Sequence, residues 1–193
     1  MELDLIFQNI SRIVSLSEED KAIFSSIAEV VAIKKKELLL SEGQVCRYDY
    51  FVLGGCMRSF YIDENLIEHT MMFAVEGWWT GNLKSFVKGL PSEFYLEAIE
   101  DTRLLRLRQA NLEKLYASVP KFERYFRILL QNRLIATQDR VSSHLSVKAS
   151  EKYEQFCKKH PALEQRVPLK YIASYLGITP TYLSRIRKKR TGR

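Results

Sequence analysis

Between residues 31 and 107 the chain consists of short apolar runs separated by turn residues. Runs that begin at Tyr50, Arg58 and Thr70 are rich in β-branched and aromatic side chains, and turn signals such as Gly54-Gly55 lie between them. Short strands at regular spacing are typical of an all-β sandwich or barrel. The pattern therefore predicts an all-β region over this part of the chain.

A helix is expected ahead of the strands. Ser17 is followed three residues later by Asp20, a spacing that matches a capping box. Ile23, Ile27 and Val30 then mark the apolar side of the helix.

After Pro120 the pattern turns helical and stays so for about 25 residues. The apolar positions follow helical spacing and are Phe122, Phe126, Leu129, Leu130, Leu134 and Val141. Such a stripe can pack on the chain's own barrel, or it can meet the same helix of a second chain as in a coiled coil. We favour the dimer, because the helix leads directly into a basic segment. Ser146 to Ser150 is expected to form a hinge, and Lys152 to Lys159 a further helix that ends before Pro161.

Two short helical patterns meet at Gly177. Pro168 is expected to begin the first helix, Thr179 to cap the second, and Pro180 to lie in its first turn. Gly177 is suited to the turn, because it adopts a positive φ without strain. The core positions are Ile172, Ala173, Leu176, Leu183 and Ile186. This is the pattern of a helix-turn-helix, whose second helix enters the major groove of DNA.

The second helix carries side chains that suit DNA recognition. A guanidinium group can bridge O6 and N7 of guanine, and a lysine can pair with a phosphate. The predicted DNA-contacting residues are Thr179, Pro180, Thr181, Tyr182, Ser184, Arg185, Lys188 and Lys189. A plain αα-hairpin is the alternative, but the small residues at the crossing, the capped second helix and the basic tail favour DNA binding.

The charge distribution supports a polyanionic partner. The net charge is +7, yet residues 140–193 carry 13 Lys or Arg against 3 Glu, so this segment has +10 and the rest of the chain −3. Confinement of the excess to one small region favours nucleic acid over a generally solvated surface.

Composition excludes several other classes. No apolar run is long enough to span a membrane, and acidic residues near the N-terminus argue against a signal peptide, so we expect a cytoplasmic protein. Three widely spaced cysteines fit reduced thiols, and the three histidines do not lie at metal-ligand spacing with them. We predict no metal and no cofactor. A cupin-like enzyme would need a cluster of His and Glu ligands, whereas the β region contains only His69, so we expect no enzyme activity.

At this point the chain resembles the Crp/Fnr family of transcription regulators over nearly its whole length. The order of elements is the same, and "VPLKYIASYLGITPTYLSRIRKK" is close to the end of the short members of this family, which are common in Bacteroidetes-type bacteria. The resemblance implies an α+β fold with a cyclic-nucleotide-binding-like β-roll (a double-stranded β-helix or jelly roll), a long dimerisation helix and a C-terminal helix-turn-helix. The expected domains are residues 1–119, 120–146 and 147–193.

Residues 77–98 line up with the cyclic-nucleotide phosphate cassette of that family. Gly77, Gly81, Leu83, Phe86 and Gly89 match its framework. The ligand-binding residues differ, because Asn82 stands in place of the Glu that binds ribose, Ser92 in place of the Arg that binds the cyclic phosphate, and Glu93 in place of a Ser or Thr. A lost guanidinium and an added carboxylate both disfavour an anionic phosphate. We therefore expect no cAMP or cGMP binding at this site.

Other sensors of the family are also disfavoured. An iron-sulfur cluster needs several N-terminal cysteines, and none precedes Cys46. His69 lies in a strand pattern, which is more typical of a packed or exposed histidine than of a haem ligand. Trp78 and Trp79 can line a pocket for another ligand, but large aromatic residues in a barrel more often belong to the core.

The DNA-reading positions also depart from the best-known family pattern. Members that read a GTGA-type half-site use Arg, Glu and Arg, whereas this chain has Pro180, Thr181 and Arg185. Only the last is retained, so a different half-site is expected. We do not expect the β-hairpin wing that usually follows, and Arg187, Lys189 and Arg190 are candidates for its phosphate contacts.

The sequence thus predicts a homodimeric, sequence-specific regulator that binds a pseudo-palindromic operator in double-stranded DNA. RNA polymerase is a further candidate partner, the effector is unidentified, and no membrane association is expected. The alternative is a ligand- or partner-binding β-roll protein whose helix-turn-helix has degenerated.

Overall fold

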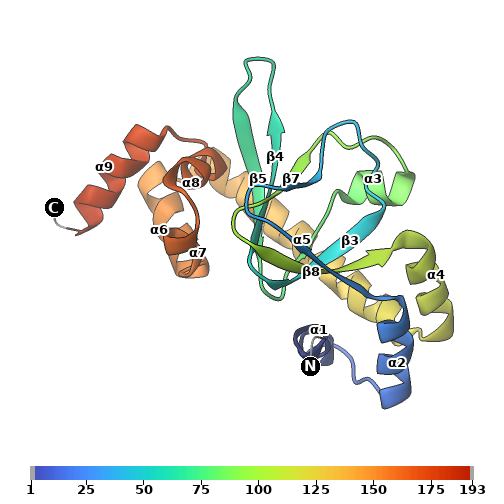
Figure 1. Ribbon diagram of the computed structural model, residues 1–193. Coiled ribbons are helices and arrows are strands. Elements are labelled where there is room, and N and C mark those ends of the chain that lie inside the picture. The colour runs from blue at the N-terminus through green and yellow to red at the C-terminus, as the bar shows by residue number, and fades with distance from the viewer. Residues whose placement is uncertain (1–2, 192–193) are drawn as a thin grey trace. The chain divides into compact units, whose positions relative to one another are not determined.

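The computed structural model describes residues 3–191, with the side chains of residues 144, 145 and 191 left aside (Figure 1). The chain divides into two compact units that are described separately. The first unit comprises Met1–Ser59 and Phe73–Asn132, and the second comprises Phe60–Met72 and Arg133–Arg193. Each unit is therefore assembled from two separate segments of the chain.

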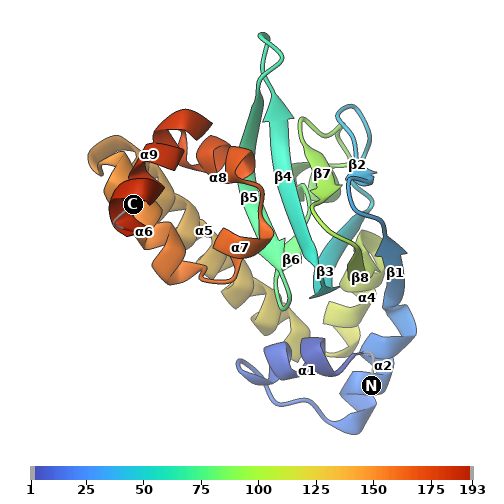
Figure 2. The same ribbon diagram turned by 60° about the vertical axis from the view of Figure 1, so that its left-hand side comes forward.

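The strands form two four-stranded sheets. One has the order β1-β8-β3-β6 and the other β2-β7-β4-β5. The bounds are β1 Glu29–Ile33, β2 Leu38–Leu40, β3 Tyr48–Gly54, β4 Cys56–Ile62, β5 Glu68–Val75, β6 Trp79–Thr80, β7 Tyr95–Ala98 and β8 Thr102–Arg108. The predicted β region is therefore confirmed. β4 and β5 continue into a long hairpin, whose distal part belongs to the second unit (Figures 1 and 2).

A close backbone approach fixes the turn between β3 and β4. Gly55 has φ 104°, and a Cβ atom at this position would lie 2.4 Å from Oγ1 of Thr102 and 2.7 Å from its Cα. Only glycine fits at position 55, so the close approach explains the second residue of the Gly54-Gly55 pair.

Helices cover the β-roll within the first unit. They are α1 Asp4–Ser11, α2 Glu18–Ile27, α3 Leu83–Lys88, α4 Gln109–Ser118 and the first turns of α5 Lys121–Ser146. The capping box predicted at α2 is present, because the Asp20 N–H donates to Ser17 Oγ at 3.1 Å and the Ser17 N–H donates to Asp20 Oδ2 at 2.8 Å. The capping motif thus led to the correct helix start, whereas Val30, expected on the apolar side of this helix, lies in β1.

Aromatic residues fill the core between these helices and the roll. The Trp79 indole N–H donates to the Tyr125 hydroxyl at 2.8 Å, and that hydroxyl donates to Asn9 Oδ1 at 2.8 Å. Phe24 stacks on Phe122 with ring centroids 5.3 Å apart. Trp79 is therefore a core residue that joins the roll to the start of α5.

The second unit contains the C-terminal helices. They are α6 Ala149–Lys159, α7 Leu163–Arg166, α8 Leu169–Leu176 and α9 Pro180–Thr191. We expected a hinge over Ser146 to Ser150. In the structure only residues 147 and 148 of this segment lie between α5 and α6. Pro168 was expected to lie in the first turn of this helix. It is instead the N-cap of α8, which begins one position later at Leu169.

Candidate nucleic-acid interface

α8, a tight turn and α9 form a helix-turn-helix near the end of the chain. Gly177 has φ 70° and ends α8 in the left-handed conformation. The N–H groups that follow return to α8, since Ile178 donates to the carbonyl of Ala173 at 3.0 Å and Gly177 to that of Ser174 at 3.1 Å. The turn thus satisfies the last carbonyl groups of the helix.

Small and branched apolar residues hold the two helices together. Ile172, Ala173 and Leu176 of α8 and Leu183 of α9 are buried, and Ile186 is half-buried. Thr179 caps α9, because its Oγ1 accepts the Tyr182 N–H at 3.2 Å. The core and cap residues expected from the sequence therefore lie where they were predicted.

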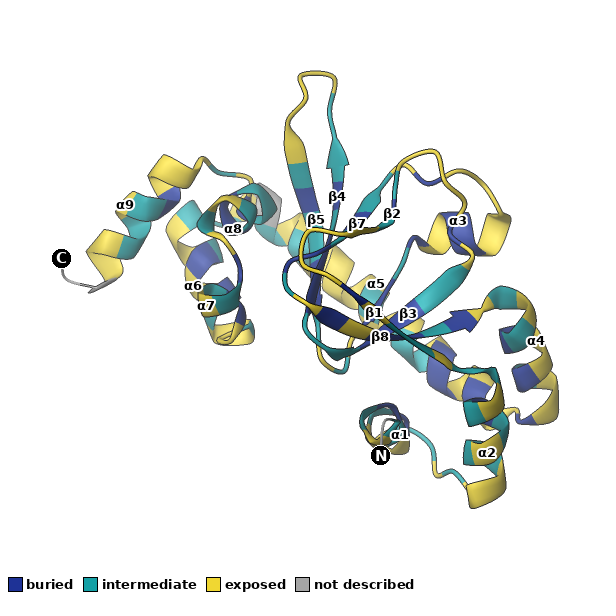
Figure 3. Ribbon diagram, viewed as in Figure 1, coloured by how far each residue is buried: buried dark blue, intermediate teal, exposed yellow. Residues whose placement is uncertain are grey.

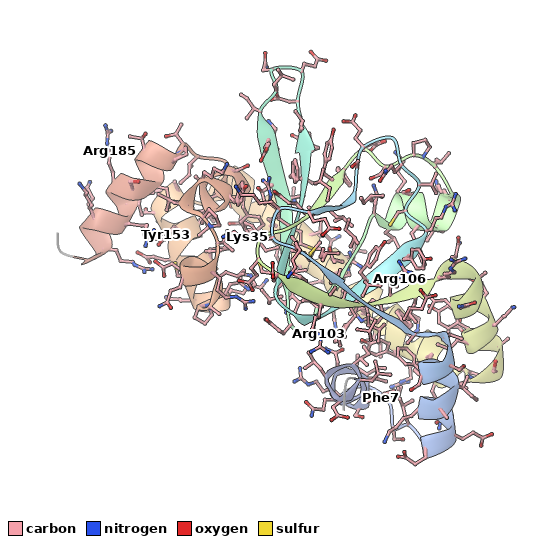
Figure 4. The ribbon with its side chains drawn as sticks, viewed as in Figure 1. Phe7, Lys35, Arg103, Arg106, Tyr153 and Arg185 are labelled. Atoms are coloured by element: carbon pink, nitrogen blue, oxygen red, sulfur yellow. The ribbon has the colours of Figure 1, made fainter. Side chains whose placement is uncertain are left out.

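The outer face of α9 carries the predicted DNA-contacting residues. The exposed ones are Thr179, Pro180, Thr181, Tyr182, Arg185, Lys188 and Lys189. Ser184 is half-buried, and its hydroxyl donates to the Pro180 carbonyl at 3.0 Å. Arg185 projects from the helix (Figure 4), and the exposed positions extend along α9 (Figure 3). The helix presents a guanidinium, two ammonium groups, hydroxyl groups and a phenol ring on one surface.

Two other cations of α9 contact an acidic residue of α7. Arg190 Nη2 lies 2.8 and 2.9 Å from the two carboxylate oxygens of Glu164, and Arg187 Nε lies 3.9 Å from Oε1. The Tyr153 hydroxyl also donates to Glu164, and the Arg190 guanidinium lies 5.0 Å from the centre of the Tyr153 ring. Arg187 and Arg190, which the sequence proposed as candidates for phosphate contacts, thus have an internal partner.

The interactions within this cluster favour the charged forms of Glu164 and Arg190. Burial tends to raise the pKa of Glu164, but hydrogen bonds from Tyr153 and Arg190 outweigh it, so the pKa lies below its usual value. The bond to Glu164 raises the pKa of Arg190. Both groups therefore remain ionised at neutral pH.

The helix-turn-helix also contacts the distal part of the β4–β5 hairpin, which belongs to the same unit (Figure 2). The Ser174 hydroxyl accepts the Thr70 N–H at 2.9 Å and donates to the Glu68 carbonyl at 2.7 Å. Arg140 of α5 donates to the Met71 carbonyl and lies 5.5 Å from the centre of the Tyr175 ring. Because β5 is the outer strand of its sheet, the Ser174 hydroxyl can satisfy two backbone groups on the open edge of this strand.

The predicted dimer residues of α5 fall into two groups. Phe122 is fully buried and Phe126 is 7% exposed, and Phe126 lies 5.1 Å from Trp79 between ring centroids. These two side chains belong to the core of their own chain and have almost no surface left for a partner. Leu129 is half-buried, whereas Leu130, Leu134 and Val141 are exposed, Leu134 by 60%.

Asn82 and Ser92, two residues of the segment that aligns with the cyclic-nucleotide cassette, are hydrogen-bonded to each other. Asn82 Oδ1 accepts the Ser85 N–H at 3.0 Å and so caps α3, and Asn82 Nδ2 donates to Ser92 Oγ at 2.9 Å. Ser92 Oγ donates to the Phe94 carbonyl at 2.8 Å and accepts the Phe94 N–H at 3.0 Å. Asn82 and Ser92 are both buried. The two positions that would contact ribose and phosphate thus form a closed hydrogen-bond network.

The rest of the cassette frames this network. Glu93 forms an ion pair with Lys84, and Gly89 ends α3 with φ 66°. A Cβ atom on Gly81 would lie 3.1 Å from Oδ1 of Asp49, which is tight for any other residue. Phe86 is buried, whereas Leu83 is exposed.

Other candidate ligands have local partners. His69 Nε2 lies 2.8 Å from Asp63 Oδ2, and its ring stacks on Tyr61 at 4.8 Å. Within residues 3–191, no group of three or more His, Cys, Asp or Glu is arranged to hold a metal ion. No helix in the described part of the chain has the length and apolar character needed to cross a membrane.

Glu164 and Ser174 were not expected to have a role at this site. Glu164 is one of three acidic residues in a basic segment, and Ser174 is a small polar residue in a short helix. Neither belongs to a local motif, because their partners lie 26 and about 105 positions away along the chain. The low number of acidic residues in the basic segment is the one signal in the sequence that could have drawn attention to Glu164.

Comparisons with known proteins agree with this geometry. Residues 30–119 match the family model of the cyclic nucleotide-binding domain. The structure is similar to that of CLP, the c-di-GMP responsive global regulator of Xanthomonas campestris, with a TM-score of 0.74, 14% identity and coverage of 91% of this chain and 92% of that one. No curated protein sequence matches the chain.

Two further solved structures are similar. FixK2 of Bradyrhizobium japonicum has a TM-score of 0.73 and 21% identity, with 86% of each chain covered. The catabolite activator protein of Thermus thermophilus has a TM-score of 0.59 and 19% identity, with 92% of this chain and 86% of that one covered. Residues 30–119 thus match the cyclic nucleotide-binding domain, and the chain has the fold of the Crp/Fnr-family transcription regulators.

Proposed function

We propose that the protein is a homodimeric transcription regulator that binds a specific DNA sequence through α9. The observation that carries this proposal is the capped helix α9, which presents Thr181, Arg185 and Lys188 on its exposed face after a left-handed glycine turn. An arginine on this face has the geometry to bridge O6 and N7 of guanine in the major groove. Lys189 would pair with phosphate and position the helix.

The part of α5 from residue 130 to residue 141 provides the dimer interface in this proposal. Leu130, Leu134 and Val141 recur at intervals of 4 and 7, so they share one side of the helix. Arg140, which contacts Tyr175 of α8, lies on another side. Exposed leucines along one stripe of a long helix are costly in water and fit the same helix of a second chain. Leu129 is about 100° from Leu130 around the helix and lies on the side of Arg140, outside this stripe.

Two-fold symmetry determines the form of the operator. Two copies of α9 related by a two-fold axis read a pseudo-palindrome, with half-site centres about 34 Å apart. A regulator of this kind acts where its DNA is, in the cytoplasm, and RNA polymerase is a candidate partner.

The β-roll is proposed not to respond to cAMP through the usual contacts. Asn82 and Ser92 satisfy each other, and the Glu93 carboxylate is already paired with Lys84. A cyclic phosphate at this position would meet no guanidinium and would break a buried hydrogen-bond network. If another effector binds, it acts by favouring one relative position of the two recognition helices.

The main test is selection of bound sequences from a random pool of double-stranded DNA at about 150 mM salt, where unspecific charge attraction is weakened. We expect a palindromic consensus. Arg185→Ala, tested in parallel, should lose the consensus at one position of each half-site. Wild-type binding that enriches no sequence would favour the alternative, a β-roll protein with a degenerate helix-turn-helix.

A second test addresses the effector. Calorimetric titration with cAMP and cGMP should give no binding heat at micromolar ligand. c-di-GMP is included because CLP is described as responsive to it. Micromolar affinity for cAMP would contradict the proposed loss of the cassette.

A further inference from the structure

The two sides of α9 differ in how their cations are held. Leu183, Arg187 and Arg190 are spaced by 4 and 3 residues, so they lie on the side of the helix that packs against the rest of the unit. Arg185 is displaced from Leu183 by about 200° around the helix and lies on the exposed side. The basic residues of α9 thus form two sets with different surroundings.

Glu164 is the centre of the inner set. Both of its carboxylate oxygens lie within 2.9 Å of Arg190 Nη2, and Arg187 Nε lies 3.9 Å away. Tyr153 of α6 binds the same carboxylate and lies under the Arg190 guanidinium. Glu164 therefore links α6, α7 and the C-terminal half of α9.

This linkage affects DNA binding through counterions. A cation that neutralises a DNA phosphate releases a condensed counterion, and each such contact steepens the dependence of affinity on salt. A guanidinium already paired with a carboxylate is a poorer phosphate ligand, because its charge is compensated and the pairing must be broken before it can turn to a phosphate. Arg187 and Arg190 thus contribute less to unspecific attraction than their charges suggest.

We propose that Glu164 is a specificity-determining positioning residue, which fixes the C-terminal half of α9 and withholds Arg187 and Arg190 from DNA phosphates. This inference rests on the proposed DNA-binding function. Its consequence is that binding depends on the exposed face of α9, where bases are read, and less on the total charge of the helix. Removal of the carboxylate raises affinity for unrelated DNA more than affinity for the operator, so the specificity ratio falls.

The first experiment measures the slope of log affinity against log salt concentration for unrelated duplex DNA. The full-length wild type, Glu164→Gln and Glu154→Gln are compared. Glu154 is an exposed carboxylate on α6, so its variant gains the same unit of net charge without touching α9. We expect Glu164→Gln to steepen the slope by about 1 to 2, as one or two cations are released, and Glu154→Gln to leave it nearly unchanged.

A second pair of variants keeps the proposal testable if Glu164→Gln folds poorly. Lys189→Gln and Arg190→Gln remove one positive charge from neighbouring positions of α9. We expect Lys189→Gln to reduce the slope by about 1 and Arg190→Gln to change it much less, because Arg190 is already paired. Circular dichroism verifies that each variant is folded.

The outcomes separate this inference from the proposed function. Equal slopes for the two glutamate variants, or equal losses for Lys189→Gln and Arg190→Gln, would overturn the role of Glu164 while wild-type DNA binding stands. Absence of wild-type binding to any DNA at low salt would overturn both.

Discussion

Arg185 is the side chain of α9 that is best suited to contact a base. It is exposed, and it lies opposite the packed side of the helix. Arg185→Ala is expected to cost about 1–3 kcal/mol of binding free energy and to relax preference at one base pair. Quantitative binding to operators with single substitutions measures both effects. Arg12→Ala, which removes an exposed cation in the first unit, should leave base preference intact, and an unchanged footprint for Arg185→Ala would rule out a base contact.

Asn82 has a structural role in the β-roll. Its side chain caps α3 and donates to the buried Ser92 hydroxyl. Asn82→Ala is therefore expected to lower the free energy of unfolding by about 1–3 kcal/mol, because it removes the cap and a hydrogen bond of a buried group.

Urea denaturation followed by tryptophan fluorescence measures the effect of Asn82→Ala. Asn65→Ala provides the control, since Asn65 is exposed in the β4–β5 turn and should change stability by less than about 0.5 kcal/mol. Equal stability of the two variants would show that Asn82 contributes little.

At the scale of elements, α5 has different roles in its two halves. Its first turns are buried on the roll through Phe122 and Phe126, while the part from residue 130 onward exposes Leu130, Leu134 and Val141. The apolar stripe that looked continuous in the sequence thus divides into a core segment and a segment available to a partner.

Leu134→Glu tests the exposed segment. A carboxylate at the centre of the proposed coiled coil would be buried without a partner, so the variant is expected to be a folded monomer. Light scattering after gel filtration measures the mass, and circular dichroism the fold. Asn132→Glu, placed on another side of the helix, should remain dimeric. A dimer for both variants would exclude this stripe as the interface.

At the scale of the whole molecule, the strand β5 takes part in both compact units. Its first residues lie with the C-terminal helices and its last residues with the roll. The Ser174 hydroxyl binds two backbone groups of its first part, Glu68 and Thr70. The helix-turn-helix is thereby attached to a strand that continues into the cyclic nucleotide-binding domain.

Ser174→Ala is expected to loosen this attachment. The Thr70 amide loses its acceptor, so its hydrogen exchange should become roughly fivefold faster for a bond worth about 1 kcal/mol. Hydrogen exchange followed by mass spectrometry or NMR measures this rate. The Cys46 amide, which donates to Ser85 Oγ at 2.8 Å in the roll, serves as internal control. Unchanged exchange at Thr70 would show that the contact does not protect this strand.

Much of the architecture follows from local signals in the sequence. The capping box at Ser17, the left-handed turn at Gly177 and the cap at Thr179 depend on residues a few positions apart, and the structure confirms each of them. The short helix α3 inside the β region was not predicted, since its six residues are too few to establish a helical period. We expected α6 to begin at Lys152, but it begins at Ala149. The small and polar residues of its first turn show no apolar periodicity that would have indicated the earlier start.

The sequence by itself determined the helix-turn-helix, the β-rich region and the position of the positive charge, because periodicity, caps and turns act over a few residues. The tertiary structure decided which apolar residues of α5 are core, which cations of α9 are paired and how Asn82 and Ser92 satisfy each other. These outcomes depend on contacts between residues far apart in the chain, such as Trp79 with Phe126 and Arg190 with Glu164. An ion pair or a buried polar network exists only where the fold brings its members within hydrogen-bond distance, and no local pattern specifies that approach.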